Sequence, residues 1–149
     1  FCFNRDLQSV TLPSSIKSIE MQAFEDNSIE SLKLDHLNNL TNIGAYAFAD
    51  NNISGEVVIP DSVTSMGYYA FGNNNIDHAI VSVNISELPL YTFYNNPNMK
   101  YVKFKNLLSS SSKFISQSWF VSISSSNLLF LYSVTDVFFV SLSSYQLFQ

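Results

Sequence analysis

The chain has 149 residues, a net charge of −5 and a hydrophobic share of 46%. This length supports one domain. The acidic balance argues against a nucleic-acid partner, because such a partner needs clustered lysine and arginine. A single cysteine, Cys2, leaves no internal disulfide to form.

One apolar pattern occurs four times between residues 16 and 93. In each copy two apolar residues stand three positions apart, and a phenylalanine follows five positions after the second. The copies are Ile16/Ile19/Phe24, Leu40/Ile43/Phe48, Val63/Met66/Phe71 and Ile85/Leu88/Phe93. The phenylalanines recur every 22 to 24 residues. Such a period is typical of a solenoid, in which each coil buries its apolar face against its neighbours.

Alternating segments predict the strands of this solenoid. Residues 10–12, 32–34, 57–59 and 102–104 alternate as a strand with one buried face does. A small residue before each phenylalanine leaves room for a tight turn of α- or 3₁₀-helix. We therefore predict a β-rich α/β solenoid with a parallel sheet of short strands, short helical turns and about 22–24 residues per coil. In the fourth copy the strand is expected around residues 79–83.

Asparagines recur three positions after each phenylalanine, at Asn27, Asn51, Asn74 and Asn96. A solenoid turns a corner in every coil, and a buried corner leaves backbone donors and acceptors to be satisfied. An asparagine side chain carries both kinds of group. We expect the four to form a structural ladder, with Asn52 and Asn73 beside it exposed. The alternative is that they contact a glycan or a metal.

The first residues are interpreted as the end of another repeat. Cys2 and Phe3 match the step from a small residue to phenylalanine, and Leu7 matches Ile29. This alignment predicts a buried Cys2. We expect the chain to be a fragment of a longer array, with a poorly protected first coil.

The repeats resemble the BspA-like class of leucine-rich repeats. The copies that carry the resemblance are VVIPDSVTSMGYYAF at residues 57–71 and LTNIGAYAF at residues 40–48. In the fourth copy Pro89 replaces the glycine and Thr92 the alanine. The resemblance covers residues 1–106. It implies a surface-exposed or secreted protein of bacteria or parasitic protists, acting in adhesion and protein recognition, with no catalytic residues and no cofactor.

Residues 107–149 form a second segment in which the repeat disappears. It is rich in serine, phenylalanine and leucine, and its only charged residues are Lys113 and Asp136. Three interpretations stay open: a degraded continuation of strands, a membrane span, and a tail with no evolved fold, such as a shifted reading frame would produce. We do not expect the membrane span, because serines, an asparagine and a glutamine interrupt the uncharged stretch.

Residue patterns typical of catalysis and metal binding are missing from the sequence. None of the four glycines forms a phosphate-binding loop. His36 and His78 lie about two coils apart in the repeat, one after its strand and the other before it. We therefore expect no shared metal, no cofactor and no enzymatic activity.

The predicted binding surface is the outward face of the parallel strands. We select Lys33, Glu56, Tyr101 and Lys103 as its contact residues. The expected partner is a protein or a glycoconjugate. The lysines near residue 103 are interpreted as a solvated strand face rather than a phosphate site. Two alternatives remain: a structural spacer in a long repeat stalk, and the non-catalytic part of a larger enzyme.

Overall fold

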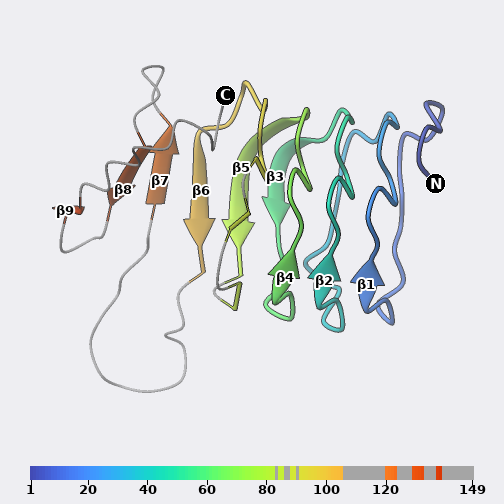
Figure 1. Cartoon of the computed structure of the whole chain (residues 1–149), viewed down its shortest axis with the longest axis horizontal. Helices are drawn as coiled ribbons and strands as arrows, with labels where there is room; N and C mark the ends of the chain where they lie inside the picture. Colours follow the sequence, from blue (N-terminus) through green and yellow to red (C-terminus); the bar gives the residue numbers. More distant parts are fainter. Residues whose placement is uncertain are drawn as a thin grey trace.

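The chain folds as a solenoid of stacked coils. The computed structural model describes residues 1–82, 84–85, 88–89 and 91–105, and the strands at 120–123, 129–132 and 137–138. Figure 1 shows the coils following one another along the long axis, with the N-terminus at one end. The predicted β-rich solenoid with parallel sheets of short strands is confirmed.

Nine strands are present among the described residues, and most are short. They are β1 Ser18–Ile19, β2 Asn42–Ile43, β3 Ser54–Val58, β4 Ser65–Met66, β5 Asn75–Val81, β6 Tyr101–Phe104, β7 Phe120–Ile123, β8 Leu129–Tyr132 and β9 Val137–Phe138. The predicted strand at 57–59 corresponds to β3 and that at 102–104 to β6. Residues 10–12 and 32–34 follow the same alternation of exposed and buried side chains without being assigned as strands.

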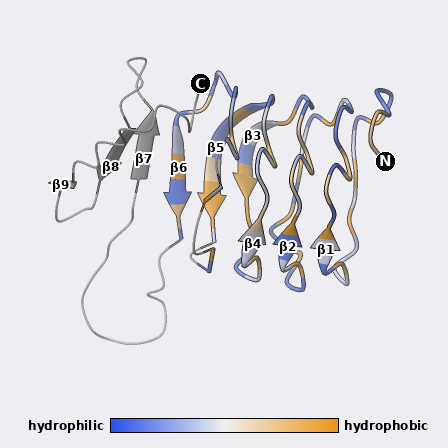
Figure 2. Cartoon of the chain, viewed as in Figure 1, coloured by the Kyte–Doolittle hydropathy of each residue, from blue (hydrophilic) through white to orange (hydrophobic). Residues whose placement is uncertain are grey.

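Two parallel sheets line different sides of the coils. One contains β1, β2 and β4, and the other begins with β3, β5 and β6. Figure 2 shows hydrophobic residues toward the ends of β3 and β5. The sheet of β1, β2 and β4 was not predicted, because a two-residue strand is too short to show an alternating pattern.

The core is built around a column of phenylalanine rings. Phe24, Phe48, Phe71 and Phe93 stack with ring centroids 5.4–5.5 Å apart and nearly parallel planes. Phe48 and Phe71 have no exposed surface. A stack repeated at the spacing of the coils explains why phenylalanine is the most regular residue of the sequence repeat.

Tight turns flank each phenylalanine where short helices were expected. The residue two positions before the phenylalanine and the residue two positions after it both have positive φ. Around Phe48 these are Tyr46 (φ 57°) and Asp50 (φ 56°). A left-handed residue on each side ends any helical hydrogen-bonding pattern, so the described residues contain turns here and no assigned helix.

The alignment of the first residues was wrong by two positions. Phe1, not Phe3, stacks on Phe24, with ring centroids 5.9 Å apart. Phe3 has φ 57° and takes the position of Asp26 in the turn after the phenylalanine. Cys2 is exposed rather than buried. The phenylalanine spacing of about 23 residues, counted back from Phe24, would have identified Phe1.

The parallel arrangement ends at β6 among the described strands. β7 pairs antiparallel with β6, β8 pairs antiparallel with β7, and β9 pairs antiparallel with β8. Residues 106–119, 124–128, 133–136 and 139–149 lie outside the described residues. The division at residue 106 and the three interpretations of the segment after it stay predictions.

Candidate functional site

The outward side chains of β3, β5 and β6 form two rows across the strand face. In one row Glu56, His78 and Tyr101 lie side by side, and in the other Val58, Ile80 and Lys103 do. Neighbouring strands of a sheet lie about 5 Å apart. Each row is therefore close enough for one ligand to contact all three of its side chains.

A shallow hollow of about 180 Å³ lies on this face. It is lined by Leu32, Lys33, Leu34, Asp35, Glu56 and Val58. Lys33 and Glu56 are both exposed, and they carry opposite charges. The hollow therefore offers a cation and two carboxylates around a small apolar floor.

A β-bulge at Gly55 turns the chain at the edge of the hollow. The pairing of β3 with β5 shifts register between Gly55 and Glu56. Gly55 has φ +76°, a conformation that side-chain-bearing residues rarely adopt, and the space around it is open. The extra residue at the shift is Asp77 of β5, because Gly55 pairs with Ile76 and Glu56 with His78.

His78 is a surface residue that the sequence interpretation missed. It was placed before its strand, yet it lies within β5 and contacts Tyr101, with ring centroids 4.4 Å apart and a 40° angle between the planes. Counting three residues from Ile76, as from Ile29 to Leu32, identifies Ala79 as the first buried strand position. That count would have placed His78 on the outward face.

The four selected binding residues form two pairs rather than one cluster. Lys33 and Glu56 line the hollow. Tyr101 and Lys103 belong to β6, which is separated from β3 by β5, and both are half-buried. His78 connects the pairs, because it faces Glu56 on one side and Tyr101 on the other.

The four recurring asparagines are buried at the corners of the coils. The Asn51 amide nitrogen donates to the carbonyls of Phe24, Phe48 and Ala49, and its Oδ1 accepts from the N–H of Ile29. Asn74 and Asn96 repeat this set one coil further on each time. The hydrogen-bonding groups of these amides are satisfied by the backbone, and this favours a structural role over ligand contact.

Asn73 is less exposed than predicted. It is half-buried, and its Nδ2 donates to Oδ1 of Asp50 at 2.6 Å, while its own Oδ1 accepts from Asn95 at 2.9 Å. Asn52 is exposed. The amide at Asn73 therefore belongs to a second line of cross-coil hydrogen bonds on the surface.

Metal-binding geometry is not found in the part of the chain that the structure describes. No group of three or more histidine, cysteine, aspartate or glutamate side chains there could hold a metal ion. The His36 ring nitrogen Nε2 lies 3.1 Å from the carbonyl oxygen of Leu12. Over the same residues, no helix has the length and apolar character that crossing a membrane requires.

Comparison with protein families identifies the repeat. The BspA type leucine rich repeat region matches residues 1–100 and 33–141, with six copies. The second match extends past residue 106, where the repeat was predicted to end. No curated protein and no solved structure matches the chain.

Proposed function

Because this chain belongs to the BspA type leucine-rich repeat family, we propose that it is a binding module whose strand face recognises a protein or a glycoconjugate. The observation that supports this most directly is the hollow between Lys33 and Glu56. It is the point of the strand face where opposite charges, an apolar floor and a backbone irregularity come together.

The size of the hollow favours a large ligand. Small-molecule pockets usually enclose about 300–1,000 Å³, whereas this hollow measures about 180 Å³ and opens onto the strand face. A stable protein interface instead uses about 800 Å² per partner. The rows of outward residues across β3, β5 and β6 supply a broad surface around the hollow, on which a macromolecule can rest.

We expect the selected residues to make different kinds of contact with the ligand. Lys33 and Glu56 would set the charge pattern that a ligand must match. Tyr101, whose ring is tilted against that of His78, would supply the aromatic anchor that often dominates interface energy. Lys103 lies two residues further along the same strand and would extend the contact.

Adhesion at a cell surface is the biological setting that we propose for this module. The family is typically surface-associated, and a broad strand face suits a macromolecular ligand on another cell or in its matrix. The location outside the cell and the adhesive role are both part of the proposal.

A charge-neutral double substitution tests the strand face. Lys33→Ala/Glu56→Ala removes one charge of each sign at the hollow and leaves the net charge unchanged. Lys17→Ala/Glu20→Ala is the matched control, because it removes one exposed lysine and one exposed glutamate elsewhere on the coil. Immobilised native chain and both variants are used to capture proteins from cell-surface extracts, and captured proteins are identified and quantified.

The proposal expects a defined protein that the native chain and the Lys17/Glu20 variant capture equally. The Lys33/Glu56 variant should capture at least about tenfold less, because truncating one charged partner in an interface commonly costs 2 kcal/mol or more. Equal capture by all three folded chains would show that the ligand does not bind at the hollow. Capture of nothing by the native chain would favour the spacer alternative.

A further inference from the structure

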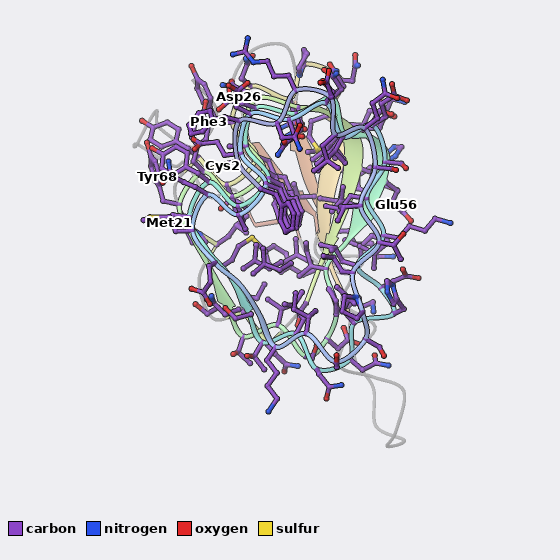
Figure 3. All side chains as sticks on the ribbon, turned by 90° about the vertical axis from the view of Figure 1, so that its right-hand side faces the viewer. Cys2, Phe3, Met21, Asp26, Glu56 and Tyr68 are labelled. Atoms are coloured by element: carbon purple, nitrogen blue, oxygen red, sulfur yellow. The ribbon has the colours of Figure 1, made fainter. Side chains whose placement is uncertain are left out.

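Five tyrosines form a continuous patch away from the strand face. They are Tyr46, Tyr68, Tyr69, Tyr91 and Tyr94, and together they are named the tyrosine patch. Figure 3 looks along the coils and places Tyr68 and Met21 on the side opposite Glu56. Tyr68 is 40% exposed and the other four are half-buried.

The tyrosine rings contact one another across three successive coils. Tyr46, Tyr69 and Tyr94 form a tilted row with ring centroids 5.1 and 5.5 Å apart. Tyr68 meets Tyr46 and Tyr91 edge to face, both at 5.5 Å. The patch is therefore an ordered aromatic surface rather than a set of separate exposed rings.

The backbone beneath the patch holds tyrosine in an unfavourable conformation. Tyr46, Tyr69 and Tyr91 have φ of 57–58°. A bulky residue in the left-handed region is an outlier, and glycine or asparagine would adopt it at lower cost. Gln22 has the same conformation (φ 59°) in the coil before the patch, so the repeated turn sets the backbone and the patch differs in carrying tyrosine there.

A glycine makes room for the central ring of the patch. A Cβ atom at Gly72 would collide with the ring of Tyr69, and the obstructing atoms belong to the ring itself. Because Gly72 has no Cβ atom, the Tyr69 ring can pack directly against the backbone of residue 72. The equivalent position is Ala49 in the preceding coil and Tyr94, itself a member of the patch, in the following one.

Negative charge borders the patch. Gln22 occupies the position of Tyr46 in the preceding coil, and its Nε2 donates to the Glu25 carboxylate at 2.7 Å. Burial and the carboxylate of Asp50 raise the pKa of Tyr69 to about 12. Among the described residues, the aromatic partner of each ring in the tyrosine patch is another tyrosine of the patch.

We propose that the tyrosine patch is a second binding surface, which takes lysine and arginine side chains of a basic peptide segment. Aromatic rings attract cations through their faces, and the carboxylates of Glu25 and Asp50 add a complementary charge. An anionic membrane surface would be repelled by the same carboxylates.

The test uses two variants that leave the net charge unchanged. Tyr68→Ala/Tyr91→Ala removes two rings, and Tyr68→Phe/Tyr91→Phe keeps both rings without their hydroxyl groups. The probe is a fluorescein-labelled peptide of alternating arginine and serine, and a peptide of alternating glutamate and serine is the control ligand. Binding to the whole chain is measured by fluorescence anisotropy, with circular dichroism melts to confirm that each variant is folded.

The native chain and the phenylalanine variant should bind the arginine peptide with similar affinity, and neither should bind the glutamate peptide. Loss of two cation–π contacts should weaken binding to the alanine variant about tenfold. Equal affinity of all three chains would show that net charge alone attracts the peptide, and would overturn the proposal. If the double alanine variant does not fold, Tyr68→Ala alone is compared with Tyr68→Phe, since Tyr68 is the most exposed ring.

Discussion

At the scale of single residues, the corner asparagines are the least replaceable polar groups of the chain. Asn51, Asn74 and Asn96 each donate to three backbone carbonyls and accept from one backbone N–H in the preceding coil, as Asn74 does with Phe48, Phe71, Gly72 and Ile53. Every buried side-chain polar atom among the described residues has a partner. Losing one amide therefore leaves several backbone groups unsatisfied at once.

Replacing Asn51 by alanine should lower the free energy of unfolding by about 1–3 kcal/mol or more, because buried backbone partners lose their hydrogen bonds. Asn52→Ala is the neighbouring control and should change it by less than about 0.5 kcal/mol, since Asn52 is exposed. Urea denaturation of the three chains makes the comparison. Equal midpoints for the two variants would contradict the structural role of Asn51.

The corner positions could be predicted from sequence because their spacing from phenylalanine is constant. Asn73 and His78 could not be predicted in the same way. The burial of Asn73 depends on Asp50 and Asn95 in the neighbouring coils, which only the three-dimensional stacking brings together. His78 was misplaced because the strand of its coil was expected around residues 79–83, whereas β5 already begins at Asn75.

At the scale of elements, the coils approach so closely that glycine is needed between them. A Cβ atom at Gly67 would collide with the backbone of Ala45, while the Gly67 N–H donates to the carbonyl of Ile43 at 2.8 Å. This contact lies directly after β4, where the chain leaves the sheet of β1, β2 and β4. The sequence repeat contained the glycine, yet nothing in its pattern predicted a second sheet there.

Gly67→Ala and Gly55→Ala distinguish two causes of a glycine requirement, a steric collision and an unfavourable φ. At Gly67 the collision is with backbone that cannot move aside, so the substitution should cost about 3 kcal/mol. At Gly55 the space is open and only the positive φ is unfavourable, so the cost should be about 1 kcal/mol. Thermal unfolding of both variants measures the difference. A larger loss at Gly55 would mean that the coils can separate at Gly67 without penalty.

At the scale of the whole molecule, stability depends on contacts between neighbouring coils. The phenylalanine column continues from Phe24 to Phe93, and each ring touches only the one before and the one after. A solenoid of this kind behaves as a row of units joined by nearest-neighbour terms. A defect in a central coil therefore weakens two interfaces at once.

Phe48→Ala should lower the free energy of unfolding by about 3–5 kcal/mol, because it removes a fully buried ring from the middle of the column. Lys33→Ala should cost less than about 0.5 kcal/mol, since its side chain is exposed. Guanidinium denaturation compares the two variants, and hydrogen exchange shows whether protection falls in the coils on both sides. Comparable midpoints would contradict the central place of Phe48 in the core.

The direction of the asparagine hydrogen bonds has a consequence for synthesis of the chain on the ribosome. The N–H groups of Ile29, Ile53 and Ile76 each find their acceptor on an asparagine that lies 20 to 22 residues later. A newly made coil therefore keeps an unsatisfied backbone N–H at its corner until the next coil has been synthesised. Growth of the solenoid should lag translation by one repeat, and the most recently made coil is the vulnerable one at every stage.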